Sequence, residues 1–447
     1  MVAHWKLALV VMAVAATWSA TVQAVTVSLN LPQALELARR HSPRLKDRGD
    51  EVAAARHRVA QAQARTLPRL GVAVRYTRVN HVEPGQISVA SPLAGVPAPP
   101  PVQLGEAVDN QVSMRLTVDQ PLFVGHALSS AKEASEYIAQ AAIERVRQEQ
   151  NDLELRVEEA YLAALLTAQF VEVADRSVKL LEQLHREATQ REKVGSGTQL
   201  DVERSRARLL GAESALLQAQ ASAELAAMNL ATLLGLDLAS VFQLAELPPL
   251  DGKESTEEIL QVQAAQQRPE LAIARAQAAA QKARLRSEVG GQYPQLWLRG
   301  GVSYDLPNQR YFPLRNQFEP SWDISAVASW NWDWSAAQQG ARAAAAETAV
   351  AERQIQSLGE AVSLEVARFR KALVSAQPRV RAADSAVSAS EIAVHRARDL
   401  CALGHSSCTQ ILDAERDLSQ ALAEQVQARA EFRLAQSRLR RAVGGHL

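Results

Sequence analysis

The sequence predicts an α+β membrane protein in which long coiled-coil helical hairpins alternate with short strands that cross a membrane. Three observations lead to this fold class: an internal duplication, a heptad pattern sustained over many turns, and segments with strict alternation of apolar and polar residues. The duplication assigns residues 25–250 to a first repeat and residues 251–447 to a second.

The first residues have the pattern of a secretory signal peptide. Lys6 precedes the apolar segment 7–16, and Val22-Gln-Ala24 is suited to cleavage. The apolar run is too short to span a bilayer comfortably. We therefore expect residues 1–24 to be a signal peptide and the mature chain to lie outside the cytoplasm. No later stretch is apolar over about eighteen residues, so no transmembrane helix is expected.

The duplication is visible in matched prolines and leucines that flank the same kinds of segment. Four positions of the first repeat have counterparts in the second: Pro43, Leu45, Pro68 and Leu70 match Pro269, Leu271, Pro294 and Leu296. The turn residues Val194-Gly195 likewise match Leu403-Gly404. A duplicated structural unit is the simplest account of these matches.

The longest segments of each repeat carry a heptad pattern. Apolar and small residues alternate spacings of four and three from Val157 to Leu181, and again from Val362 to Cys401. Such a seam is the mark of a coiled-coil helix, and its many alanines let neighbouring helices pack closely.

Each heptad segment turns at a glycine and resumes, which predicts a helical hairpin over about 126–235 and another over about 336–444. At about 1.5 Å per residue, the first helix of each hairpin would reach on the order of 100 Å. Pro378 interrupts the second of these helices and is expected to bend or locally unwind it.

The segments that flank the helices have period two and predict strands. We expect four of them, at about 68–82, 110–124, 294–305 and 321–334. About ten residues in a tilted strand cross a bilayer, and outward apolar residues alternating with inward polar ones are typical of a membrane barrel. A water-soluble sandwich with one buried face is the alternative.

Tryptophans gather in the last predicted strand. The four within it, Trp322, Trp330, Trp332 and Trp334, share one face and alternate with polar residues. Because Trp is enriched at membrane–water boundaries, we expect them at the membrane interface. Four strands cannot close a barrel, and open sheet edges are not tolerated in lipid, so several chains must share one barrel.

The ordered set of motifs resembles the TolC-type outer-membrane efflux family. The resemblance covers nearly all of the mature chain. It is carried by LPQALELARRHSPRL (31–45), DQPLFVGHALSSAKEAS (119–135), VGSGTQLDVERSRARLLGAES (194–214), RPELAIARAQ (268–277) and LGHSSCTQILDAERDLSQA (403–421).

The resemblance implies a homotrimer in the outer membrane, with a shared twelve-stranded barrel above a long periplasmic helical tunnel. It also implies a periplasmic adaptor (a membrane fusion protein) and a proton-driven or ATP-driven inner-membrane transporter as partners. The function expected is a passive exit duct of a tripartite efflux system. Two alternatives stay open: the exit duct of a type I protein-secretion system, and a soluble periplasmic coiled-coil scaffold or adaptor, which leaves the tryptophan face unexplained.

The resemblance also implies a gate near the hairpin tips. Asp201 and Asp413 match acidic positions that narrow the closed entrance, and Gln410 stands where another family member carries an aspartate. Three symmetry-related carboxylates around a narrow axis repel each other and attract cations. The alternative for both aspartates is a favourable position at the N-terminal end of a helix dipole.

The two turns are the expected adaptor-docking tip, because exposed turn backbone can be approached closely. The tip comprises Val194, Gly195, Leu403 and Gly404.

Cys401 and Cys408 flank the second turn, and the oxidising periplasm favours a disulfide between them. Alternatively, Cys401 is a small buried residue of the heptad seam.

No catalytic, cofactor-binding or metal-binding motif stands out, so the chain is not expected to be an enzyme. His395 and His405 lie near the cysteines, but their spacing fits no standard metal pattern. The 49 basic and 49 acidic residues show no clustered basic excess of the kind that nucleic acid requires.

Overall fold

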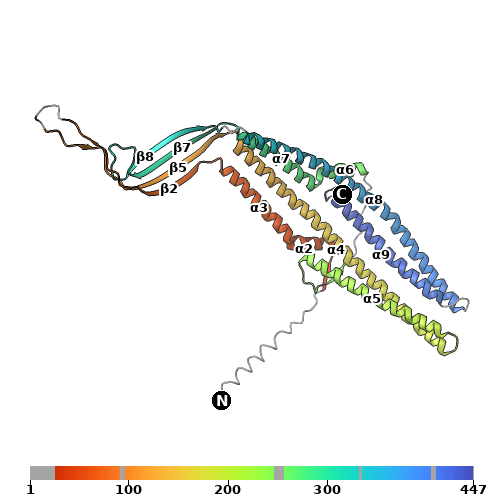
Figure 1. The fold of residues 1–447 in the computed structure, drawn as a ribbon. Helices are drawn as coiled ribbons and strands as arrows, with labels where there is room; N and C mark the ends of the chain where they lie inside the picture. Colours follow the sequence, from red (N-terminus) through yellow and green to blue (C-terminus); the bar gives the residue numbers. More distant parts are fainter. Residues whose placement is uncertain are drawn as a thin grey trace, which may run out of the picture. The chain divides into compact units, whose positions relative to one another are not determined.

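The computed structural model describes residues 26–90, 95, 97–245, 256–331, 335–403 and 409–445. The predicted signal peptide, residues 1–24, lies outside this range. The described chain combines long helical hairpins with a four-stranded antiparallel sheet (Figure 1), which confirms the predicted α+β fold class. No helix within the described ranges is both long and apolar enough to cross a membrane.

The chain divides into two compact units, which we name by their content. The helical unit comprises Met1–Asp47, Val146–Pro269 and Gly359–Leu447, and the sheet unit comprises Arg48–Arg145 and Glu270–Leu358. Both predicted repeats contribute to both units. The compact units are therefore a different division of the chain from the sequence duplication.

The sheet unit is built on four strands in the order β2-β5-β7-β8. Their bounds are Arg69–Arg78, Asn110–Val124, Gln295–Leu306 and Glu319–Ser329. All neighbours in the sheet are antiparallel. A separate small ladder joins β3 (Gln86–Ile87) to β4 (Val102–Gln103).

Two strands are shorter at one end than the sequence predicted. The first was expected over about 68–82, but β2 ends at Arg78 because its partner β5 begins at Asn110 and offers no ladder further on. The last was expected over about 321–334, but β8 ends at Ser329, where its pairing with β7 also ends. Residues 332–334 lie outside the described range.

Small side chains allow the helices of the sheet unit to approach each other closely. Ala55 of α3 (Pro43–Ala64) packs with Ala139 and Ala142 of α4 (Ala127–Lys193). On another face of α4, Ala141 packs with Ile273 and Ala276 of α7 (Pro269–Gly290). These contacts lie outside the heptad seams read from the sequence, and they follow the same rule that small side chains let helices pack closely.

Two helical hairpins run through the helical unit. The first joins α4 to α5 (Gln199–Leu234), and the second joins α8 (Ala336–Ala402) to α9 (Thr409–Val443). Helix α8 stays helical across Pro378, so the local unwinding offered as one of two expectations there is wrong. A helix tolerates an internal proline by forgoing one backbone hydrogen bond and bending.

The largest core of the helical unit surrounds Tyr161, which is fully buried. Its hydroxyl lies 2.7 Å from the carbonyl oxygen of Ala245 and 3.0 Å from that of Leu29. Leu29 is the last residue of β1 (Thr26–Leu29), and Ala245 directly follows β6 (Val241–Leu244), which pairs with β1 in parallel. Two short helices complete the unit: α2 (Leu31–His41) and α6 (Glu257–Gln267).

Candidate functional site

One face of the four-stranded sheet is apolar from edge to edge. Directly opposed residues of antiparallel strands share a face, and the row Val72, Leu116, Val302 and Trp322 crosses all four strands. Val72 is 78% exposed and Trp322 is 70% exposed. A continuous exposed apolar face of this kind marks a surface that contacts lipid or another apolar partner.

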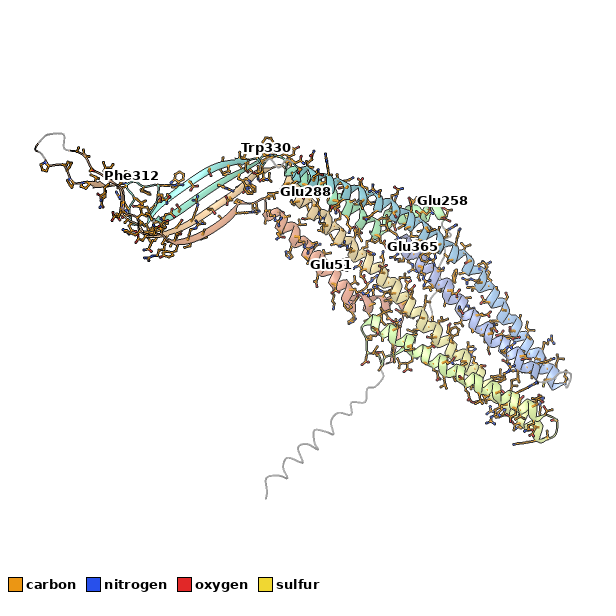
Figure 2. All side chains as sticks on the ribbon, in the orientation of Figure 1. Glu51, Glu258, Glu288, Phe312, Trp330 and Glu365 are labelled. Atoms are coloured by element: carbon orange, nitrogen blue, oxygen red, sulfur yellow. The ribbon has the colours of Figure 1, made fainter. Side chains whose placement is uncertain are left out.

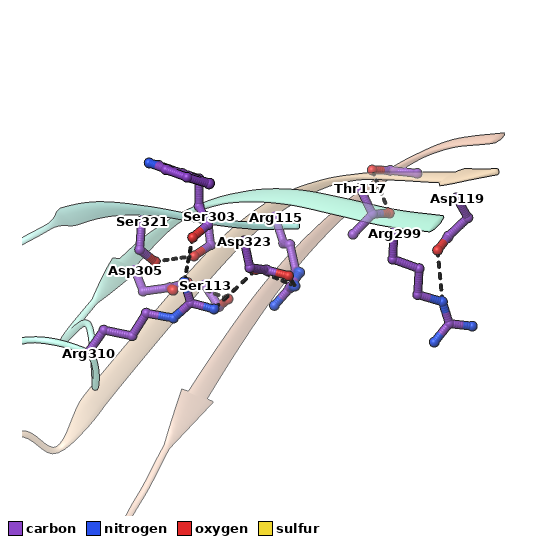
Figure 3. A network of polar contacts seen from close by, with 12 residues as sticks. Ser113, Arg115, Thr117, Asp119, Arg299, Ser303, Asp305, Arg310, Ser321 and Asp323 are labelled. Atoms are coloured by element: carbon purple, nitrogen blue, oxygen red, sulfur yellow. Dashed lines mark hydrogen bonds and ion pairs between the residues drawn. The ribbon is translucent and has the colours of Figure 1, made fainter. Parts of the chain in front are cut away.

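The opposite face of the same sheet is polar and is crossed by ion pairs (Figure 3). Arg115 of β5 pairs with Asp323 of β8 at 2.9 Å, reaching across β7. Gly301 of β7 makes this possible, because a Cβ atom there would stand 2.9 Å from Nη2 of Arg115. Nearer the other end of the face, Arg299 pairs with Asp119 at 3.1 Å.

The two faces need two different solvents. Large apolar side chains are stable in hydrocarbon, whereas the paired arginines and aspartates need water. A sheet with lipid on one face and water on the other is the wall of an aqueous channel through a membrane.

Aromatic side chains lie at both ends of this sheet. Trp330 follows β8 at one end and donates from Nε1 to the carbonyl of Gln292 at 3.2 Å, while Phe312 lies at the opposite end (Figure 2). Trp322 lies on the apolar face within β8. Trp332 and Trp334 lie outside the described residues, so the interface role of these tryptophans stays a prediction.

The first hairpin tip is an exposed turn between α4 and α5. Val194 is exposed there, and Gly195 adopts a left-handed backbone (φ 74°) with no atom near its Cβ position. Thr198 is the N-cap of α5, and Asp201 completes a capping box with it. The Asp201 carboxylate accepts from the Thr198 hydroxyl at 2.6 Å and from its N–H at 3.3 Å. This geometry matches the helix-cap alternative for Asp201.

At the second tip, Leu403 is exposed just after α8. Gly404 and Cys408 lie outside the described residues. Cys401 is buried and disulfide-bonded, and the Arg191 guanidinium approaches its sulfur at 3.3 Å. The pairing with Cys408 stays a prediction.

The other two gate candidates lie together on α9. Gln410 and Asp413 line an open hollow of about 450 Å³ whose other wall is α8, and Asp201 does not line it. Arg208 of α5 donates to Asp413 at 3.0 Å, which joins the first hairpin to the second.

A buried carboxyl supports the same pair of helices. Glu415 of α9 accepts from Arg398 of α8 at 2.9 Å. Burial raises the pKa of the Glu415 carboxyl above its usual value, and the Arg398 charge opposes that rise.

Sequence reasoning missed Arg208 and the Arg115–Asp323 pair. Heptad spacing shows which residues of a helix are apolar, but it does not show which helix faces meet. For the sheet, the alternation placed Arg115 and Asp323 on the polar side. To predict that they pair, the order and register of the strands would also have to be known. Among the described residues, no group of three or more His, Cys, Asp or Glu is placed to hold a metal ion.

Comparison with solved structures shows which known folds this fold is similar to. The fold is similar to that of the outer-membrane channel OprN (TM-score 0.77, 20% identity, 93% of this chain and 90% of that chain). It is also similar to the outer membrane protein VceC from Vibrio cholerae (0.76, 19%, 93% and 96%) and to the open state of the Neisseria gonorrhoeae MtrE channel (0.74, 17%, 93% and 89%). The fold is thus that of the outer-membrane channels.

A second comparison concerns the first half of the sequence. Residues 34–236 match the family model described as "Outer membrane efflux protein". No curated protein sequence matches the chain. The match and the fold together confirm the resemblance to the outer-membrane efflux family that the motifs indicated. The chain is thus similar to outer-membrane efflux proteins in sequence over residues 34–236 and to outer-membrane channels in fold.

Proposed function

We propose that three copies of this chain form the exit duct of a tripartite efflux system. The observation that supports the proposal is that the sheet has one apolar face and one polar face. Its outer strands β2 and β8 each pair on one side within the described chain, so the sheet is open at both edges. Open edges are not tolerated in lipid, and three copies of four strands supply the twelve that the resemblance implies.

The duct is passive, because transport energy comes from an inner-membrane transporter. The polar faces of the sheets line the lumen, and cargo leaves through it. Charged residues such as Arg115 and Asp323 keep this wall hydrated. At rest the hairpin tips are closed. The Arg208–Asp413 pair supports this gate, since it fastens one hairpin to the other at the hollow that Gln410 and Asp413 line.

The exposed tips are the adaptor-docking surface. Val194 and Leu403 project from the two turns, and Gly195 leaves its turn backbone open to close approach. Gly404 completes this surface in the proposal.

Channel formation is the first test. The full chain, purified from outer membranes in detergent, is expected to migrate as a heat-modifiable oligomer and to give discrete conductance steps in a planar lipid bilayer. Extraction without detergent, with no oligomer and no conductance, would favour the soluble scaffold and overturn the duct.

The second test identifies the partner. A photo-crosslinking residue placed at Leu403 in cells is expected to capture a periplasmic adaptor, identified by mass spectrometry, whereas the same residue at the buried position Val366 is expected to capture none. An adaptor of a proton-driven pump assigns small-molecule efflux, and an adaptor of an ATP-driven exporter assigns type I secretion. Capture of no adaptor at Leu403 contradicts the docking surface.

A further inference from the structure

The loop that joins β7 to β8, residues 307–318, folds back onto the polar face of the sheet. Asn308 is its anchor and is only 3% exposed. Its Nδ2 donates to the Glu319 carbonyl and to the Ser321 hydroxyl, both at 3.0 Å. Ser321 lies on the polar face, where its hydroxyl also meets that of Ser303 at 2.8 Å (Figure 3).

Arg310 extends this attachment further along the face. Its Nη2 lies 3.1 Å from Oδ1 of Asp323, and its Nη1 donates to the Trp322 carbonyl at 2.7 Å. The Arg310 backbone N–H in turn bonds to the Asn308 side chain at 3.0 Å. Asp323 therefore accepts from Arg310 of the loop and from Arg115 of β5 at once.

The far limb of the loop is attached elsewhere. Gly105 and Leu314 form a parallel β-bridge, and the Asn316 N–H donates to the Glu106 carboxylate at 2.9 Å. Both of these partners precede β5. The loop is thus held to β8 on one side and to the segment before β5 on the other.

We propose that the loop is a fixed strap across the lumenal face and that Arg310 is its latch, which sets the upper size of cargo that leaves the duct. This inference rests on the proposed function, because the polar face is lumenal only if the sheet is part of a channel wall. Three copies of the strap would face one another at the outer end and narrow the exit. The Arg115–Asp323 pair remains when Arg310 is removed, so the latch opens without dismantling the sheet.

Single-channel recording with neutral polymers tests the latch. For the full chain in planar bilayers, Arg310→Ala is expected to raise the conductance and to shift the exclusion limit of polyethylene glycols to larger polymers. Because the polymers are uncharged, their exclusion limit depends on the width of the pore. The loss of the Arg310 charge alone is therefore not expected to change this limit. Arg310→Lys is expected to show a smaller shift, because one ammonium cannot reach both Asp323 and the Trp322 carbonyl.

The matched control is Arg299→Ala, which removes an arginine from the same face and breaks its pair with Asp119 without touching the loop. It is expected to leave the exclusion limit unchanged. An exclusion limit for Arg310→Ala equal to that of the wild type, in channels that do form, would overturn the strap and leave the duct intact. A wild-type chain that forms no channels overturns the proposed function itself, and the strap with it.

Discussion

The four-stranded sheet and the helical hairpins place their apolar residues in opposite ways. In the sheet, large side chains such as Val72 and Ile324 are exposed over a whole face. In the hairpins, Val157 and Leu230 are buried between helices, together with alanines such as Ala160 and Ala164. The same hydrophobic effect acts in both regions. The helices supply each other's apolar environment, whereas the sheet requires one from outside the chain.

Charged residues follow the same contrast. In the helical unit, arginines near the end of α9 reach carboxylates of α4, as in Arg440–Glu158 at 2.9 Å and Arg441–Asp152 at 2.8 Å. In the described part of the sheet, the pairs Arg115–Asp323 and Arg299–Asp119 both lie on the polar face. The positions of the ion pairs therefore distinguish the sheet from the helical unit.

The largest effect is expected from a charge on the apolar sheet face. Ile324→Lys places an ammonium in lipid, which costs about 2–4 kcal/mol near the bilayer midplane, in every copy of the assembly. Ser325→Lys, one residue along on the polar face, is the matched control. The yield of heat-modifiable oligomer in outer-membrane fractions is expected to collapse for the first and persist for the second. Equal yields would contradict the assignment of the two faces.

The next largest effect is expected from a buried leucine of the helical unit. Leu230 is 0% exposed in the core around Tyr161, and Leu225 on the same helix is 68% exposed. Leu230→Ala is expected to lower the free energy of unfolding by about 2–5 kcal/mol. Leu225→Ala is expected to change it by about 0.5 kcal/mol or less. Chemical unfolding of the helical signal in detergent measures both, and a large loss at Leu225 would show that a neighbouring copy covers it.

The third prediction addresses the gate. Arg208→Ala removes the partner of Asp413 and is expected to raise the conductance of the closed duct several-fold, because the link between α5 and α9 is lost. Arg206→Ala, an exposed arginine on the same helix, is the control and is expected to behave as the wild type. If both variants conduct alike, Arg208–Asp413 does not fasten the gate.

The fourth prediction separates two roles of Asp201. Thr198→Ala removes the N-cap of α5 and is expected to cost about 0.5–2 kcal/mol of stability. Asp201→Asn keeps a side-chain oxygen for the cap but removes the charge. A change in cation selectivity for Asp201→Asn, measured as a reversal potential, supports the gate role. A loss of stability in both variants with unchanged selectivity supports the cap role alone.

The smallest effect is a pH dependence at Glu415. Its folded-state pKa lies above the unfolded value of 4.5, so folding favours the protonated form. The stability cost of the ionised carboxyl is absent below about pH 4.5 and grows as pH rises through the folded pKa. Thermal unfolding midpoints of the wild type are expected to fall slightly across that window, and those of Glu415→Gln to stay flatter. Parallel pH profiles would argue against this linkage.

The periodic elements follow from the sequence because their signals are local. Alternation along Leu70–Tyr76 and heptads along Val362–Cys401 depend only on which residues are apolar. The two faces of the sheet and the helical hairpins can therefore be predicted from the sequence. Strand ends are less local. Residues 79–82 lie beyond the ladder between β2 and β5, and pairing decides where a strand stops.

The sequence by itself therefore predicted the kinds of element, their order and the two faces of the sheet, and it led to the expectation that several chains share one barrel. Only the tertiary structure decided that Arg208 meets Asp413 and that Arg310 pairs with Asp323. The physical reason is that periodicity is set by neighbours along one chain segment. An ion pair between segments depends on the register, rotation and loop path of both.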